Sequence, residues 1–198
     1  MVRYTPSCRT ATPARKRVPP ECADLGFRAL RYRAGVTSAA ERPLLFLDVD
    51  GPLIPFGSAT GAVAPAGAGN PLLARLDPRA GARLMDLGCD LVWATTWMEE
   101  ANTVVAPRIG LPRLPVLEWP EPAARAGPRG LHWKARALVE WAGARPFIWV
   151  DDEINAVDRQ WVGAAHPGPY LLHRVDPAEG LTDADFAVLA VTARSFGG

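Results

Sequence analysis

Long apolar runs are missing from this sequence of 198 residues. No stretch approaches the roughly 20 apolar residues that a helix needs to cross a bilayer, and the N-terminus has no continuous apolar segment of the secretory type. We therefore expect a soluble, cytoplasmic protein with no membrane partner. Nothing in the sequence bears on its oligomeric state.

Cysteine is also scarce. The three cysteines, Cys8, Cys22 and Cys89, are odd in number and form no CxxC pair, and none has a histidine near it in the sequence. This pattern excludes a disulfide framework and a cysteine-histidine zinc site.

Positive charge is sparse over most of the chain, although the formal net charge is +1. Residues 1–42 hold nine Lys and Arg side chains and three acids, whereas the remaining chain holds 13 basic and 18 acidic residues. A mildly acidic body argues against the broad contact with phosphate backbones that drives non-specific nucleic-acid binding.

The sequence divides into an extension at residues 1–41 and one domain at residues 42–198. The extension, which includes TPSCRTATPARKRVPP, is basic and rich in Pro, Ser and Thr, so it buries too little surface to offset its ordering entropy. We expect it to be flexible. A nucleic-acid-binding arm, an organelle-targeting segment and an upstream sequence wrongly included in the reading frame are the alternatives.

Short apolar runs alternate with helical patterns in the rest of the chain. Runs that predict buried strands occupy residues 43–51, 89–96, 145–153 and 169–175. Helical patterns occupy residues 77–88, 131–143 and 154–165, and a capped helix opens at Thr182 or Asp183. Segments 57–71 and 120–130 are rich in Gly, Ala and Pro and predict loops. Strands alternating with helices predict an α/β fold, a doubly wound three-layer parallel sheet with helices on both faces.

Polar residues stand where three of these runs end. They are Asp48 and Asp50, Thr95 and Thr96, and Asp151 and Asp152, and Lys134 lies near the start of the helix before the third run. Because ligands of such sheets bind outside the carboxyl ends of the strands, these side chains are expected to converge on a site for a metal and a phosphate.

Asp48 and Asp50, the two acids at the end of the first strand, need a bound cation or a proton to offset their mutual repulsion. Gly51 permits the backbone turn that brings both into the crevice, where like charges repel. A cluster of acids without histidine suits Mg²⁺, which prefers oxygen ligands.

FLDVDG, the threonine ending a second strand, the lysine and the late DD together resemble the four motifs of the haloacid dehalogenase (HAD) superfamily, from about Arg42 to the last helix. The resemblance implies a Rossmann-like fold and a Mg²⁺-dependent phosphatase. It makes Asp48 the nucleophile that forms an aspartyl-phosphate and Asp50 the general acid and base. By the same resemblance, Thr95 would form a hydrogen bond with a phosphoryl oxygen. Lys134 would neutralise negative charge on the nucleophile and on the phosphate.

The metal and substrate contacts follow from the same resemblance. Asp48 and Asp152 would hold Mg²⁺ with the backbone carbonyl of Asp50, and Asp151 would be a further ligand or an acceptor behind the ligands. Thr96 competes with Thr95 as the second-motif residue. Gly51, Thr96 and Trp97 are assigned to substrate binding.

Two positions depart from the pattern. Pro52 supplies neither a hydroxyl nor an amide donor where the family often has Thr or Val. The fourth motif often has another acid at the position of Ala156, and Asn155 and Asp158 stand nearby. These departures motivate an alternative, a catalytically inactive domain that serves as a binding or regulatory module.

Cap insertions of the family would fall at residues 53–88 and 97–130, and both intervals are short. A near-capless enzyme with a minimal cap is expected, open to a large phosphorylated substrate such as a protein or a nucleic-acid end. Trp93, Trp141 and Trp149 lie in apolar patterns and are predicted to be core residues, whereas Trp97 and Trp133 are candidates for stacking on a base or sugar.

Overall fold

The computed structural model describes residues 41–57, 70–119 and 129–197. The predicted extension lies outside them except for Glu41, as do the inner parts of both predicted loops. The elements in order are β1 Leu44–Leu47, the 3₁₀-helix η1 Pro71–Arg75, α1 Ala80–Met85, β2 Asp90–Trp93, the π-helix η2 Ala101–Val105, α2 Ala106–Ile109, α3 Ala135–Ala142, β3 Phe147–Asp151, α4 Ala156–Ala165, β4 Tyr170–Arg174 and α5 Asp183–Phe196.

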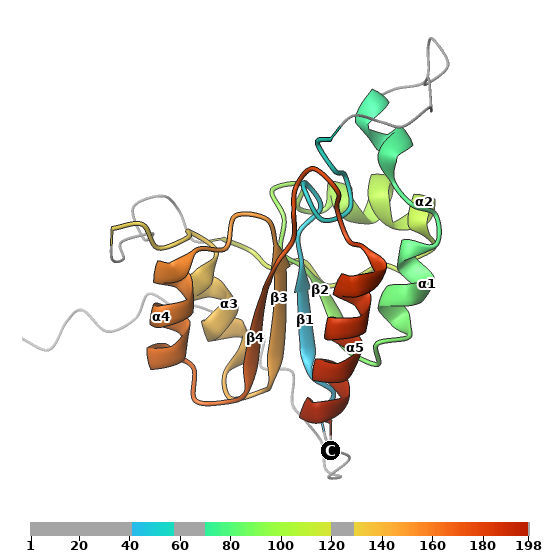
Figure 1. Ribbon diagram of the computed structural model, residues 1–198. Coiled ribbons are helices and arrows are strands. Elements are labelled where there is room, and N and C mark those ends of the chain that lie inside the picture. The colour runs from blue at the N-terminus through green and yellow to red at the C-terminus, as the bar shows by residue number, and fades with distance from the viewer. Residues whose placement is uncertain (1–40, 58–69, 120–128, 198) are drawn as a thin grey trace, which may run out of the picture. The chain divides into compact units, whose positions relative to one another are not determined.

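The four strands form one parallel sheet in the order β2-β1-β3-β4 (Figure 1). The chain runs outward from β1 to β2 and then returns to place β3 on the other side of β1. The strand order therefore reverses between β1 and β3, and a crevice opens at that switch point outside their carboxyl ends. The predicted doubly wound α/β fold is confirmed.

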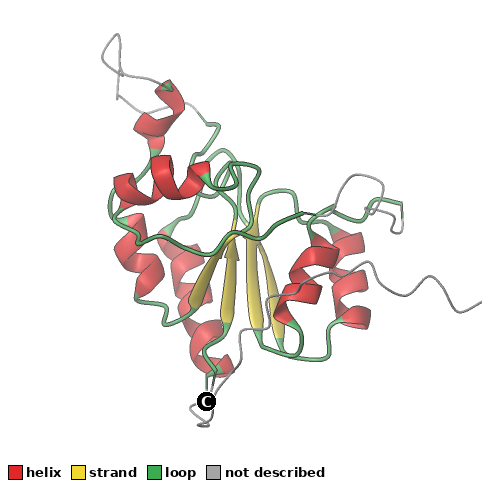
Figure 2. Cartoon of the chain, turned by 180° about the vertical axis from the view of Figure 1, so that it is seen from behind, coloured by secondary structure: helices red, strands yellow, loops and turns green. Residues whose placement is uncertain are grey.

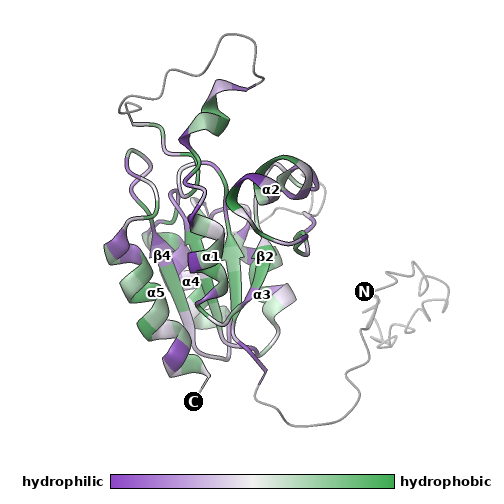
Figure 3. Ribbon diagram, turned by 90° about the vertical axis from the view of Figure 1, so that its right-hand side faces the viewer, coloured by the Kyte–Doolittle hydropathy of each residue, from purple (hydrophilic) through white to green (hydrophobic). Residues whose placement is uncertain are grey.

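Helices cover both faces of the sheet. α3 and α4 lie on one face, and α1, α2 and α5 lie on the other (Figures 1 and 2). In β1, Leu45 and Leu47 pack with the second group and Leu44 and Phe46 with the first, and all four side chains are buried. Figure 3 shows strands dominated by hydrophobic residues and helices that mix both kinds. Because helices cover both faces of the sheet, every side chain of β1 is buried, and the strand has no polar residue before Asp48.

The predicted strands and main helices are present with shorter bounds. α5 begins after Thr182, whose side chain accepts a hydrogen bond from the backbone amide of Asp185, while the Asp185 carboxylate accepts one from the Thr182 amide. This capping box satisfies backbone donors that the helix itself leaves unpaired.

None of the helices in the described ranges is long and apolar enough to cross a membrane.

Residues 101–109 are helical, and buried Asn102 anchors them: its side chain accepts from Trp93 Nε1 at 3.0 Å and from the Leu114 amide at 2.8 Å. The expectation that Trp141 is a core residue was wrong. It is 45% exposed near the end of α3, where the helix turns it away from the sheet.

Candidate active site

Asp48 stands directly after β1, at the carboxyl edge of the sheet. Its side chain is nearly buried, and Oδ1 accepts a hydrogen bond from the amide of Val49 at 2.7 Å. The chain then turns: Gly51 has a φ of +81°, and its amide donates to the carbonyl of Ile54 at 3.1 Å. The turn keeps Asp48 and Asp50 on the crevice side of the sheet.

Lys134 joins the ends of β1 and β3. It precedes the first residue of α3 and is 2% exposed. Its ammonium forms an ion pair with Asp48 Oδ2, and it donates to Asp151 Oδ2 at 2.7 Å. One buried cation therefore serves two buried carboxylates, which leaves one negative charge in excess when both are ionised.

The electrostatics of this triad favour a bound cation. Burial raises the pKa of Asp48 to about 7; the Lys134 ammonium opposes this shift and the Asp151 carboxylate adds to it. Burial alone would lower the pKa of Lys134, but the charges of Asp48 and Asp151 raise it, so the ammonium stays protonated. Burial also raises the pKa of Asp152, with help from Asp151 and Glu153. A second positive charge beside these groups would stabilise the ionised carboxylates.

The oxygen atoms of Asp48, Asp151 and Asp152 are close enough to share an ion. One carboxylate oxygen from each lies within 4.8 Å of the others. Gly51 brings the β1 turn against Asp152, since a Cβ atom at Gly51 would lie 2.5 Å from Asp152 Cγ. An all-oxygen donor set of this kind fits Mg²⁺ better than a soft or nitrogen-seeking metal.

Asp151 differs from the other two acids, because donors already surround it. Its Oδ2 accepts from Lys134 and from Trp149 Nε1 at 3.2 Å, and its Oδ1 accepts from the Glu153 amide at 2.9 Å. Asp152 is partly exposed and is the acid of this pair that faces solvent. The geometry therefore suits Asp151 as a partner of Lys134, and Asp48 with Asp152 as the pair open to a metal.

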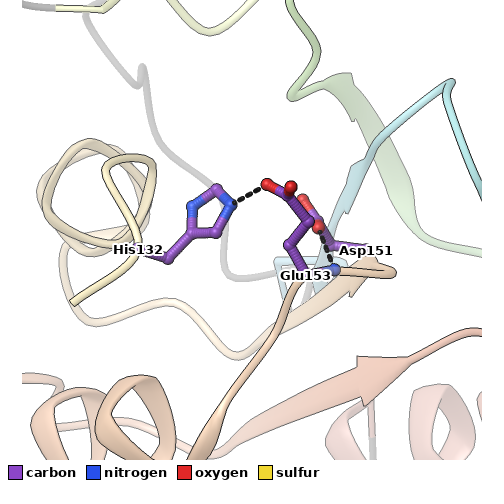
Figure 4. A group of neighbouring side chains, drawn as sticks. All are labelled: His132, Asp151 and Glu153. Atoms are coloured by element: carbon purple, nitrogen blue, oxygen red, sulfur yellow. Dashed lines mark hydrogen bonds and ion pairs between the residues drawn. The ribbon is translucent and has the colours of Figure 1, made fainter. Parts of the chain in front are cut away.

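His132 belongs to a second group of neighbouring side chains, with Asp151 and Glu153 (Figure 4). Its Nδ1 accepts from the Lys134 amide at 3.1 Å, so Nε2 carries the proton and donates to Glu153 Oε2, also at 3.1 Å. Both ring nitrogens are thus used, and His132 holds the start of α3 rather than offering a lone pair to a metal.

Asp158 fixes the same segment from α4. Fully buried, it accepts from the His132 amide at 2.6 Å and from the Asn155 amide at 2.8 Å. Asn155 caps α4 in return. Asn155 and Asp158, which stand near Ala156 where the family often has an acid, therefore anchor the segment before α3 that carries Lys134 to α4.

The second strand contributes Thr95, Thr96 and Trp97. Thr95 is fully buried and its Oγ1 accepts from the Trp97 amide at 3.3 Å, which leaves its own proton free to donate, whereas Thr96 is exposed. Trp97 Nε1 donates to Asp50 Oδ2 at 3.0 Å. Thr96 and Trp97 also line a pocket of about 530 Å³.

The switch-point site, with its aspartate pair after β1, its buried lysine and its acids after β3, defines a member of the HAD superfamily. A family model confirms it: residues 44–186 match the HAD domain in Swiss Army Knife RNA repair proteins, and the chain belongs to this family. No curated protein and no solved structure matches the chain.

The structure brings most of the predicted residues together. Asp48, Lys134, Asp151, Asp152 and Gly51 meet at the switch point. Asp50 reaches Trp97 instead, and Trp133 stacks beside His132 and against Trp119. The sequence pointed to Asp158 only as a neighbour of the absent late acid, and the particular contacts of His132, Glu153 and Asp158 were not predicted; the third acid of the DDE run was the one available signal for Glu153.

Proposed function

We propose that the domain is a Mg²⁺-dependent phosphomonoesterase that works through an aspartyl-phosphate on Asp48. The observation that carries the proposal is the placement of Asp48: a nearly buried carboxylate at the switch point, ion-paired to Lys134 and within 4.8 Å of a further acid on β3. Phosphoryl transfer needs little covalent work from the protein beyond positioning and charge stabilisation, and this site supplies both.

Each side chain has a defined part. An Asp48 oxygen attacks phosphorus and the ester P–O bond breaks, while Asp50 gives its proton to the departing alcohol oxygen. Asp50 then takes a proton from a water molecule, the water oxygen attacks phosphorus, and the bond to Asp48 breaks to release phosphate. Thr95 donates to a phosphoryl oxygen, and Lys134 limits the negative charge at the nucleophile.

Mg²⁺ bound by Asp48, Asp152 and the Asp50 carbonyl would neutralise charge on the phosphoryl group. Asp151 keeps Lys134 in place behind these ligands. Gly51, which has no side chain, lets the turn after β1 lie against Asp152, because a Cβ atom there would be 2.5 Å from Asp152 Cγ.

The phosphorylated end of an RNA strand is the substrate class that we propose. The description of the family, RNA repair proteins, favours it. The near-capless expectation agrees with a large substrate, although residues 58–69 and 120–128 of the two cap intervals lie outside the described residues. Nucleic-acid binding by the basic residues 1–41 stays a secondary prediction.

The alternative, an inactive binding module, is motivated partly by Pro52. Pro52 lies in a turn whose own hydrogen bonds come from the amides of Gly51, Leu53 and Ile54, so the turn itself needs no donor from the proline. Its carbonyl accepts from the Leu181 amide at 2.9 Å.

Phosphate release tests the proposal. Wild-type protein and Asp48→Asn are assayed with 4-nitrophenyl phosphate and with RNA oligonucleotides bearing a 3′- or 5′-phosphate, with Mg²⁺ or with EDTA. We expect turnover that needs Mg²⁺ and falls at least about 1,000-fold in Asp48→Asn. Wild-type protein that releases no phosphate from any of these substrates, at any Mg²⁺ concentration, would overturn the proposal.

A further inference from the structure

Trp97 touches the general acid and a pocket at the same time. Its backbone is held in the loop after β2, where its amide donates to Thr95 Oγ1 and its carbonyl accepts from the Glu100 amide at 2.9 Å. Its indole N–H reaches across to Asp50 Oδ2 at 3.0 Å. The indole thus links Asp50, the proton donor in the turn after β1, to the loop after β2.

The pocket that Trp97 lines draws on three segments of the chain. Its walls are Asn70 and Leu73 at η1, Thr96 and Trp97 after β2, and Glu100 and Val104 at η2. Its volume of about 530 Å³ is within the range of small-molecule sites. Trp97 lines the pocket and its indole N–H donates to Asp50, so one side chain connects the pocket with the general acid.

The lining indicates what the pocket holds. Trp97, Leu73 and Val104 offer aromatic and aliphatic surface, while Asn70 and Thr96 offer hydrogen bonds. The Glu100 carboxylate disfavours a second phosphate group in the pocket. A neutral planar ring with polar edges, such as a nucleobase, meets all of these conditions.

We propose that Trp97 couples the leaving group to its proton donor: the indole N–H positions Asp50, and the ring forms the wall on which the base of a nucleotide substrate stacks. The inference rests on the proposed function, since Asp50 must stand on the leaving-group side of phosphorus to protonate the alcohol. Trp97 is a positioning residue for Asp50 and a binding residue for the base. Stacking on an aromatic side chain contributes about 1–3 kcal/mol per base.

Two esters with different leaving groups distinguish a positioning role of Trp97 from a merely structural one. Nitrophenolate departs without a proton, whereas the ribose oxygen of a nucleoside monophosphate needs one. Trp97→Phe keeps a ring and removes the N–H, so the single-turnover rate of alcohol release should fall at least about tenfold on the nucleotide, whereas the single-turnover release of nitrophenol from 4-nitrophenyl phosphate should fall less than about threefold. Trp141→Phe, the same change at the exposed end of α3, should alter neither rate.

A second variant tests the pocket itself. Val104→Trp fills the space beside Trp97 and should raise KM for a nucleoside monophosphate at least about tenfold, while KM for glycerol phosphate, which has no ring, changes less than about twofold.

Equal losses on both esters in Trp97→Phe, or an unchanged nucleotide KM in Val104→Trp, overturn this inference and leave the phosphatase proposal standing. Wild-type protein without turnover on any of the esters overturns both.

Discussion

Replacing Lys134 by methionine leaves two buried carboxylates facing each other. The side chain is nearly isosteric, so packing is kept, but Asp48 and Asp151 both lose their only ion-pair partner among the described residues. At the 2.7 Å separation from Asp151, the attraction amounts to about 6 kcal/mol at an effective dielectric constant of about 20. Much of this is offset, because the mutant no longer desolvates an ammonium group.

The expected net effect is a loss of about 3–5 kcal/mol in the free energy of unfolding, the range found when one partner of a buried pair is removed. This is a large share of the roughly 5–15 kcal/mol that stabilises a domain. The loss should shrink at lower pH. Without the ammonium, the pKa of Asp48, which burial already raises to about 7, rises further above its unfolded value, so folding gains stability as Asp48 binds a proton and loses it as pH rises.

Urea denaturation of wild type and Lys134→Met at pH 6 and pH 8, each with and without Mg²⁺, measures these effects. Mg²⁺ should recover part of the loss, since it also brings positive charge to Asp48. Arg79→Met is the matched control: it removes a cation from an exposed pair with Asp77 and should leave the free energy of unfolding close to that of wild type. A Lys134→Met protein as stable as wild type at both pH values would refute the reasoning.

Three further predictions concern residues that shape or support the site. Gly51→Ala should lower the folding equilibrium constant and kcat by at least about tenfold each, because the φ of +81° is strained for alanine and the new Cβ meets Asp152. An unchanged kcat would contradict this close approach of the turn to Asp152. Asp158→Ala should cost about 2 kcal/mol or more in urea denaturation by leaving the buried His132 amide and the partly buried Asn155 amide without an acceptor, and Asp158→Asn should cost less. Burial would raise the pKa of Asp185, but hydrogen bonds from Thr182 and His173 hold it below its usual value. Its stabilisation is therefore present above pH about 4 and lost as pH falls through the lowered pKa, so Asp185→Asn should be less stable than wild type at pH 7 and the gap should narrow as pH falls below about 4; a gap that stays constant over this range would contradict this.

The ends of the strands were predictable because two rules act together there. The interior of a strand buried on both faces has no place for a charge, so β1 is apolar up to Asp48, which follows it, and β3 is apolar up to its last residue, Asp151. Parallel strands then bring those ends to one edge. The acids of the site could therefore be grouped without coordinates, and Lys134 joined them by its place before α3.

The supports of the site could not be predicted, because they depend on contacts between distant residues. Asp158 and His132 are 26 positions apart, and Trp97 and Asp50 are 47 apart. No local pattern distinguishes such residues from ordinary helix caps or packing aromatics. The anchor of the helix after β2 is another such contact: Asn102, a polar residue in a weakly periodic segment, is held by tertiary hydrogen bonds rather than by helix propensity.

The division of Asp151 and Asp152 shows where coordinates sharpen the account. Adjacent acids in a sequence look equivalent, yet successive residues leaving a strand point in different directions. Asp151 turns into the protein toward Lys134 and Trp149, and Asp152 stays partly exposed beside Gly51. This difference underlies the proposal that Asp152 binds the metal and Asp151 holds the lysine.

Trapping the covalent intermediate tests the central claim most directly. Asp50→Asn removes the base that activates water, while nitrophenolate needs no acid to leave, so the variant should react once with ³²P-labelled 4-nitrophenyl phosphate and stop. After acid quench and peptide mapping, we predict close to one label per protein on the peptide that contains Asp48, and none when Asp48 is also replaced by Asn. Release of labelled phosphate together with nitrophenol, with no label on Asp48 at any time, would contradict the account.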